Sequence, residues 1–481
     1  HLGHWMKETI GGLFKKSTMR HTGERASISQ FQALCTALAA TIGVGNIAGV
    51  AAAIVTGGPG AVFWMWVAAF FGMMTNYSEN VLGIFFRRKN KDGEWSGGPM
   101  YYLRDGLGGR KNCRVLGRLL AGLFSIFAIL ASFGIGNIGQ INKIVANIES
   151  AFPIQALTET AVLGTELYKL IIGGVLMLIA ALIVLGGIQR IAVIAEKVVP
   201  FMVCLYMLGS LIIIFANVSS IGPAFAAIFK NAFTGNAAWG GAVGYTFSVC
   251  ITQGFKRGAF SNEAGLGSSV MVHSNSNVVE PVKQGLWGIF EVFADTFVVC
   301  TMTALVVLTS GVIDLNTGVL AAGTSGDATL VAKAFDSIFT FGGVHFGSMF
   351  IAIAVLLFAF TTVLGWSHYG TKAWEYLFGT KSVILYRIVF VLMIMSGAVM
   401  TSSLAWDISD TFNGLMMIPN LIGVLSLSLL VRRITKNYID RRIHGKKEVA
   451  PMLSFDAETQ KEQLVKLQSE DAEEKPVPAA K

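Results

Sequence analysis

The sequence predicts an all-α polytopic membrane protein with about ten transmembrane helices in two inverted five-helix repeats, of which helices one and six are broken. The first observation is composition: 53% of the 481 residues are hydrophobic and only 14% are charged, whereas soluble proteins carry about 25% charged residues. The second is a series of apolar stretches of the roughly 20 residues that a helix needs to cross a bilayer. The third is the placement of basic residues, which gather in alternate connections between these stretches.

Each expected span is an apolar stretch, although glycine and polar residues interrupt several of them. In order, the expected spans are 31–55, 60–86, 117–142, 168–186, 192–217, 238–258, 285–310, 345–368, 382–400 and 408–431. Five of them precede residue 218 and five follow it, and the first span of each half is broken by glycine. Because five is odd, the second half starts from the opposite side of the membrane, which is typical of secondary transporters with their site at the broken helices.

This reading divides the chain into five segments. A cytoplasmic basic segment, 1–25, precedes the first five-helix repeat, 26–217. An extracellular loop, 218–237, leads to the second five-helix repeat, 238–435, and a cytoplasmic polar tail, 436–481, ends the chain.

The basic residues set the orientation, because connections rich in lysine and arginine stay in the cytoplasm. With ten spans both termini lie on the same side, and all but four of the 37 basic residues then fall on the cytoplasmic side; the four are Lys143, Lys169, Lys230 and Lys333. The formal charge of +8 therefore marks the inner face of a plasma membrane. We expect the lipid bilayer as a partner and no nucleic acid.

Enzyme chemistry finds no support in the motifs. The five cysteines form no Cys-x-x-Cys pair, and H-E-x-x-H, G-x-S-x-G and P-loop patterns are absent from the sequence. Residues 134–139 match G-x-G-x-x-G, but they lie within an expected membrane helix and not in a βαβ unit. Asn137 and Gln140, three residues apart in that span, either bond neighbouring helices or line a polar cavity.

The first span contains the stretch 41–49, in which Gly43 and Gly45 favour a break in mid-membrane. Unwinding leaves backbone amides and carbonyls without helical partners, and in a bilayer these groups must be satisfied. A carboxylate satisfies the amides and a small cation the carbonyls. The alternative is a packing seam of small residues, since Gly45 and Gly49 also match a helix-contact motif.

The sixth span, with Gly244 and Gly254, occupies the same place in the second half. Its polar, glycine-rich continuation, 256–268, is expected at the cytoplasmic edge, as an inner gate, a hinge or a capped helix end.

The eighth span offers oxygen ligands and a pocket wall. The hydroxyls of Thr361 and Thr362 complete a sodium shell with the carbonyls of span one, or else they bond back to their own helix. Trp366, one turn beyond Thr362, is positioned to form the wall of a small pocket. Asp295 is the deepest of the acidic residues in spans and offers a proton relay as the alternative, but the lack of a chain of carboxylates and histidines favours a metal cation.

Four stretches, 41–49, 57–72, 261–268 and 361–367, resemble hallmark motifs of the alanine/glycine:cation (sodium:alanine) symporter family. The resemblance covers roughly residues 25–435. It implies the LeuT-type fold and sodium-driven uptake of alanine or glycine across the plasma (inner) membrane of a prokaryote, with sodium as coupling ion and no cofactor. One departure is that the extra helix usual ahead of the family's core is represented here only by the segment 1–25.

The resemblance also implies roles for individual positions. Substrate contacts are implied for Thr41, Val44, Gly45, Asn46, Gln140, Ile251, Thr362 and Trp366. Sodium ligands are implied for Ala39, Ile42, Thr361 and Thr362. The alternatives are a symporter driven by protons, an amino-acid sensor that does not transport, and a channel.

Overall fold

The computed structural model describes residues 2–15, 19, 27–162, 164–233, 247–315, 318–324 and 326–473. The helices are α1 (Leu2–Glu8), α2 (Ile10–Lys15), α3 (Gln30–Thr41), α4 (Val50–Gly57), α5 (Gly60–Phe86), α6 (Pro99–Tyr101), α7 (Arg114–Phe133), α8 (Gly139–Ala151), α9 (Gln155–Thr158), α10 (Leu167–Val184), α11 (Gly187–Ala216), α12 (Ile221–Phe233), α13 (Phe247–Asn262), α14 (Val270–His273), α15 (Pro281–Val292), α16 (Thr301–Thr309), α17 (Ala328–Asp336), α18 (Phe346–Phe378), α19 (Val383–Val399), α20 (Ser402–Arg442) and α21 (Ala457–Glu473). Three antiparallel hairpins of two strands connect some of them: β1 (Arg88–Lys89) with β2 (Trp95–Ser96), β3 (Ala161–Val162) with β4 (Thr165–Glu166), and β5 (Thr340–Phe341) with β6 (Val344–His345).

Within the described residues, seven helices are long and apolar enough to cross a membrane, or eight if the bent pair α3 and α4 counts as one span. α5 is a further helix of 27 residues, which corresponds to about 40 Å at 1.5 Å per residue. α13 covers the second part of the expected sixth span, and the first part of that span, 238–246, lies outside the described residues. The all-helical membrane architecture is confirmed, while the count of ten and the inverted repeats stay predictions.

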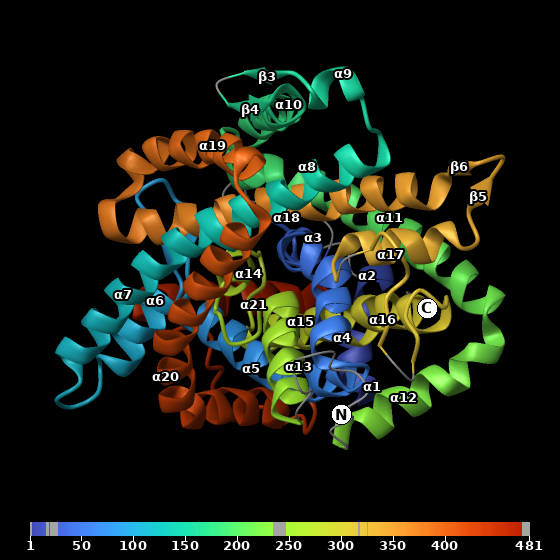
Figure 1. The fold of residues 1–481 in the computed structure, drawn as a ribbon. Coiled ribbons are helices and arrows are strands. Elements are labelled where there is room, and N and C mark those ends of the chain that lie inside the picture. The colour runs from blue at the N-terminus through green and yellow to red at the C-terminus, as the bar shows by residue number, and fades with distance from the viewer. Residues whose placement is uncertain are drawn as a thin grey trace, which may run out of the picture.

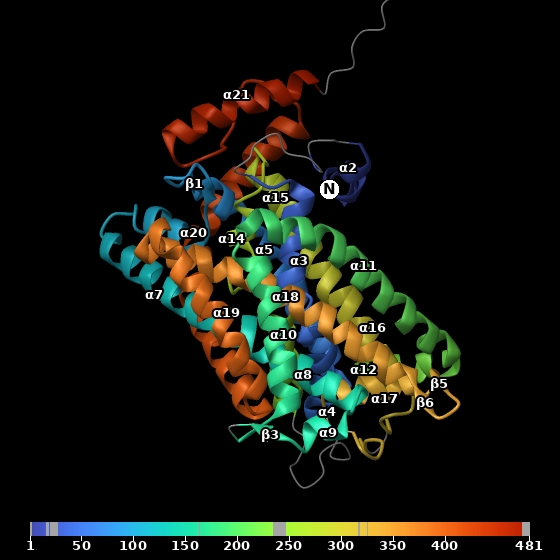
Figure 2. The same cartoon turned by 90° about the horizontal axis from the view of Figure 1, so that it is seen from above.

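The broken helix α3–α4 lies in the middle of the bundle (Figure 1). α5 packs against both α13 and α15, while α18 packs against α7 and α8. Figure 2 shows α21 and the N-terminus at one end of the molecule, with α9, β3 and the β5–β6 hairpin at the other. Both described ends of the chain therefore lie at the same end of the bundle.

The first spanning helix breaks where the sequence predicts. α3 begins at a capping box on Ser29 and ends at Thr41, after which Ile42 is extended, with φ −78° and ψ 90°. Helical structure resumes as a π-helical turn over Gly45–Gly49, and the two parts are bent by 52°. Small size is essential at Gly43, because a Cβ there would lie 2.6 Å from Oγ1 of Thr362.

Gly244 lies outside the described residues, and within the described part of the second half the helix is interrupted further along the chain than Gly254. α13 is helical through Gly254 and ends at Asn262, and the chain then takes left-handed conformations at Glu263, Gly265 and Gly267, with φ of 57°, 92° and 72°. The sequence places this stretch at the cytoplasmic edge, but Ser261, Asn262 and Glu263 are buried in the interior. α13 therefore continues past Gly254, and left-handed backbone after Asn262 interrupts it.

The connection expected as an extracellular loop, 218–237, contains α12. Ala224, Ile228 and Ala232 recur every four residues along it and are buried, so one apolar face packs against the bundle. The indole of Trp64 donates to the carbonyl of Ala232 at 3.0 Å. With 13 residues, or about 20 Å, α12 is too short to span a bilayer.

The polar tail is packed against the protein over part of its length. Leu453 and Leu467 are buried with Val279 in a small apolar cluster, and the backbone amide of Phe455 donates to the carbonyl of Phe85 at 2.8 Å. Polar composition is typical of a solvent-exposed segment, whereas the few apolar residues of this tail pack against the protein.

Glu280, at the start of α15, forms ion pairs with the polar tail. It is 1% exposed and accepts hydrogen bonds from Arg441 at 2.7 Å and from Arg442 at 2.5 Å. Burial by itself would raise the pKa of Glu280, but the hydrogen bond from Arg441 and the charges of Arg442, Arg441 and Lys283 outweigh it and hold the pKa below its ordinary value of 4.5.

Because the folded protein holds this pKa below that of the unfolded chain, Glu280 stabilises the fold fully above pH 4.5 and loses this contribution as the pH falls further. We expect Glu280→Gln to lower the melting temperature in detergent by a few degrees at pH 7, and to reduce the loss of stability between pH 5 and pH 3. Thermal unfolding at several pH values checks this. An unchanged melting temperature at pH 7 would contradict the stabilising role.

Candidate functional site

The break in the first helix presents backbone amides to side-chain oxygens. The amide of Val44 donates to Oε1 of Gln140 at 3.1 Å, and the amide of Gly43 donates to Oδ1 of Asn46 at 2.9 Å. The side-chain amide of Gln140 in turn donates to the carbonyl of Ile135. A carboxylate can take the place of these side-chain oxygens, because backbone amides at a helix break bind anions.

The same break presents carbonyls to the hydroxyl of Thr362. Oγ1 of Thr362 lies 3.0 Å from the carbonyl oxygen of Ala39 and 3.4 Å from that of Ile42. The carbonyl of Phe358, on its own helix, lies at 3.0 Å. Because the carbonyl of Phe358 also accepts a backbone amide within α18, and one hydroxyl hydrogen cannot satisfy both Ala39 and Ile42, the cluster at these two carbonyls is rich in oxygen and short of donors. Hard cations such as sodium prefer this kind of ligand set.

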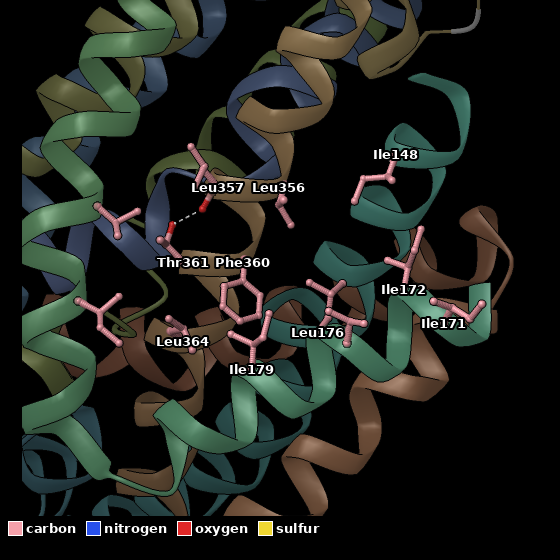
Figure 3. A pocket seen from close by; sticks show the side chains of 13 residues that line it. Ile148, Ile171, Ile172, Leu176, Ile179, Leu356, Leu357, Phe360, Thr361 and Leu364 are labelled. Carbon is pink, nitrogen blue, oxygen red and sulfur yellow. Dashed lines mark hydrogen bonds between the residues drawn. The ribbon is translucent and has the colours of Figure 1, made fainter. Parts of the chain in front are cut away.

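Thr361 meets this cluster only at the carbonyl of Phe358. Its hydroxyl lies 2.9 Å from the carbonyls of Leu357 and Phe358 and 3.5 Å from the sulfur of Met202 on α11. Figure 3 shows it beside a pocket of about 450 Å³ that is otherwise lined by hydrocarbon side chains of α8, α10, α11 and α18. Consecutive residues of an α-helix point about 100° apart, so Thr362 reaches the carbonyls of Ala39 and Ile42, whereas Thr361 shares only the carbonyl of Phe358 with it.

A buried carboxylate lies close to the break. Asp295 accepts hydrogen bonds from the amide of Asn46 at 2.6 Å, from the hydroxyl of Ser261 at 2.8 Å and from that of Thr296 at 2.8 Å. It is 0% exposed and lies in a π-helical stretch, Phe293–Cys300. π-helical turns inside α-helices are frequent at functional sites.

No lysine, arginine or histidine pairs with Asp295 among the residues that the structure describes. A buried carboxylate with neutral donors alone is costly unless a cation or a proton neutralises it.

The end of α13, rather than its middle, approaches the break. A Cβ placed on Gly45 would lie 3.1 Å from the ring of Phe260 and 3.4 Å from Cα of Ser261. Ile251 lies ten residues earlier on the same continuous helix, which is about 15 Å along its axis. The structure therefore does not bring Ile251 to the break, and Phe260 and Ser261 take that place. The polar stretch that starts at Ser261 was the sequence signal for this position.

The wall residue Trp366 has a partner that the sequence analysis did not single out. The indole N–H of Trp366 donates to Oε1 of Glu263 at 2.7 Å, and both side chains are buried. Glu263 was not considered as a membrane carboxylate because its segment was expected at the cytoplasmic edge. A Cβ on Gly136 would lie 2.3 Å from Cβ of Trp366, so this glycine permits close packing of α18.

The remaining predicted residues divide between the break and other contacts. Gln140 lies at the break, whereas Asn137 donates to the carbonyl of Phe390 at 2.7 Å and so bonds a neighbouring helix. Asn46 links the break to Asp295. The hydroxyl of Thr41 bonds back to the carbonyls of its own helix, with the carbonyl of Ala37 at 3.2 Å.

Aromatic and charged side chains close one side of this region. The rings of Phe260 and Trp406 are 5.0 Å apart. Asp410 on α20 forms ion pairs with Lys256 at 2.7 Å and with Arg257 at 3.6 Å, both on α13. These contacts join α13 to α20 over the end of α13 that meets the break.

A central broken helix with oxygen ligands at the break, inside a bundle of spanning helices, defines a multi-pass membrane transporter. Solved transporters share this fold. The structure of MhsT in complex with L-phenylalanine matches with a TM-score of 0.54 at 14% identity and covers 83% of this chain and 89% of that chain. A manganese transporter of Eremococcus coleocola matches with a TM-score of 0.50 at 12% identity, over 91% of this chain and 83% of that one. These likenesses show the LeuT-type fold.

The chain belongs to the sodium:alanine symporter family, whose family model matches residues 4–452. It is 43% identical to the sodium/alanine symporter AgcS of Methanococcus maripaludis, over 92% of this chain and 91% of the relative. It is 37% identical to the probable sodium/glutamine symporter GlnT of Bacillus subtilis, over 92% and 85%. It is 35% identical to the putative sodium/proton-dependent alanine carrier protein YrbD of the same organism, over 92% and 86%.

Membership confirms the predicted family and fold and identifies the chain as a cation-coupled amino-acid transporter rather than an enzyme.

Two of the glycines of the broken helix, Gly43 and Gly49, allow a matched test of the oxygen cluster. A Cβ on Gly43 would lie 2.6 Å from Oγ1 of Thr362 and 3.0 Å from Oε1 of Gln140, whereas the nearest atom to a Cβ on Gly49 lies at 4.0 Å. We expect sodium chloride to raise the melting temperature of the wild-type protein relative to potassium chloride. Gly43→Ala should abolish this rise, because the new methyl group displaces Thr362. Gly49→Ala should retain it. An equal sodium effect in both variants would contradict a cation site at this break.

Proposed function

We propose that this protein carries alanine or glycine into a prokaryotic cell together with sodium, by alternating access across the plasma (inner) membrane. The observation that carries the proposal is the break at residues 42–45, which offers acceptor carbonyls to Thr362 and a donor amide to Gln140. One unwound turn thus has a place for a cation and a place for a carboxylate. Transport of this kind needs sodium as coupling ion and no further cofactor.

Sodium would bind first, between the carbonyls of Ala39 and Ile42 and the hydroxyl of Thr362. It would replace the hydroxyl hydrogen as the partner of these carbonyls and so join the first broken helix to α18. The ion adds positive charge to an oxygen-rich cavity, which stabilises a bound carboxylate nearby. Sodium binding and substrate binding would strengthen each other for this reason.

The substrate carboxylate would take the amides of Val44 and Gly45, displacing the side chain of Gln140 from Val44. The ammonium group needs acceptors, and Asp295, held by Asn46 and Ser261, offers a negative charge in this region. Trp366 and Gln140 would confine the substrate side chain, because both are bulky and buried. This confinement limits the substrate to the size of alanine or glycine.

Alternating access requires one side to open while the other closes. We assign the contact of Phe260 with Trp406, and the ion pairs of Asp410 with Lys256 and Arg257, to the outer side, which departs from the cytoplasmic side that the sequence predicts for these two basic residues. On the inner side, the amide of Ile28 donates to the carbonyl of Asn275 at 3.0 Å, and the amide of Asn277 donates to the carbonyl of Ile28 at 2.9 Å. These two hydrogen bonds join a residue just before α3 to residues after α14, and opening inward would break them. The orientation with both termini in the cytoplasm is part of the proposal.

The two neighbouring threonines allow a direct test. In proteoliposomes with an inward sodium gradient, we expect accumulation of labelled alanine that potassium does not support. Thr362→Val, which removes the hydroxyl at constant size, should raise the sodium concentration for half-maximal uptake at least tenfold. Thr361→Val is the matched comparison and should have a clearly smaller effect, because that hydroxyl meets the cluster only at the carbonyl of Phe358 and not at those of Ala39 and Ile42. Equal effects of the two substitutions would contradict the assigned cation site.

Coupling to protons is the second candidate, because Asp295 is a fully buried carboxylate whose described partners are neutral donors. If protons drive transport, alanine uptake persists in potassium under an inward proton gradient, and Asp295→Asn abolishes its pH dependence. If sodium drives transport, wild-type uptake in potassium is absent at every pH. The measurement is initial uptake rate between pH 5.5 and pH 8.5 in both salts.

A further inference from the structure

Glu263 occupies a backbone position that does not favour it. It follows the last residue of α13 and has φ of 57°, a left-handed conformation that is strained for residues with a Cβ and relaxed for glycine. The next two left-handed positions of the segment are glycines, Gly265 and Gly267. A residue kept in strained backbone at a buried site points to a requirement for its side chain.

The carboxylate of Glu263 joins two parts of the protein. Oε1 accepts the indole N–H of Trp366 on α18 at 2.7 Å, and Oε2 accepts the hydroxyl of Ser268 at 2.5 Å. Glu263 is only 3% exposed. One carboxyl group thus holds both the unwound segment and the indole ring by a hydrogen bond to each.

Trp366 is held from two sides as a result. Its Cβ lies against the backbone of Gly136, where a methyl group would come within 2.3 Å, and its ring N–H is fixed by Glu263. Trp366 is one helical turn from Thr362, whose hydroxyl lies at the carbonyls of Ala39 and Ile42. The orientation of the indole ring therefore depends on the segment that follows α13. Its place on α18, one turn from Thr362, puts it near the carbonyls of the first broken helix.

We propose that Glu263 is a positioning residue that sets the size of the substrate, by holding the indole of Trp366 as a fixed wall of the pocket. The inference rests on the proposed function. Without the hydrogen bond the ring can turn about its side-chain torsions, and the pocket then admits a longer side chain. One additional methylene group in a tight pocket typically changes discrimination by about 10-fold to 200-fold.

The test is competition by 2-aminobutyrate, one methylene longer than alanine, against uptake of labelled alanine. The measured quantity is the ratio of the inhibition constants of unlabelled alanine and 2-aminobutyrate. Trp366→Phe and Glu263→Gly should each shift this ratio about tenfold in favour of 2-aminobutyrate. Glycine is chosen at position 263 because it suits the left-handed backbone and so favours folding.

Three further variants separate positioning from general damage. The double variant should shift the ratio no further than either single variant, because both remove the same hydrogen bond. Glu263→Gln keeps an acceptor oxygen and should stay within twofold of wild type. Trp374→Phe, which removes another indole of α18, one that donates to Ser382 beyond the end of that helix at 3.0 Å, should also leave the ratio unchanged.

Wild-type selectivity in Glu263→Gly, together with a shift in Trp366→Phe, would overturn the inference, and so would additive shifts in the double variant. If Glu263→Gly is not recovered folded, Glu263→Met, which lacks the acceptor oxygen, takes its place with the same expected result. Absence of sodium-dependent alanine uptake in the wild-type protein would instead overturn the proposed function, and the inference with it.

Discussion

The structure depends on one constraint, that backbone groups freed by breaking a helix inside a membrane must find partners within the protein. The break between Thr41 and Gly45 frees amides and carbonyls in the middle of the bundle. Gln140 and Asn46 supply acceptors to the amides, and Thr362 reaches the carbonyls. The polar side chains of this region are arranged around those backbone groups, and a ligand that replaces them has sites ready for it.

The second interruption meets the same constraint with carboxylates. Glu263 binds Trp366 and Ser268, and Glu79 on α5 accepts from Asn420 at 2.5 Å, which also donates to the carbonyl of Gly265. The unwound segment is thereby tied to α18, α5 and α20. Moving it relative to α18 has to break hydrogen bonds of buried carboxyl groups, which makes intermediate positions costly and favours discrete states.

The sequence predicted what depends on neighbours in the chain and missed what depends on distant packing. Composition and glycine spacing predicted the helical membrane fold and the break at Gly43, because both follow from local chemistry. The structure directs Thr361 to α11 and keeps Ile251 away from the break, since these placements depend on helix rotation and on where α13 ends. Glu263 was missed because its left-handed backbone is visible only in the folded chain.

The central claim is that movement of a cation and movement of an amino acid are linked through the first break. The most direct measurement is accumulation of labelled sodium in proteoliposomes that have an inward alanine gradient and no initial sodium gradient. The account predicts that alanine drives sodium inward against its own gradient, and that dissipating the alanine gradient stops it. Sodium flux that is the same with and without alanine would contradict the account.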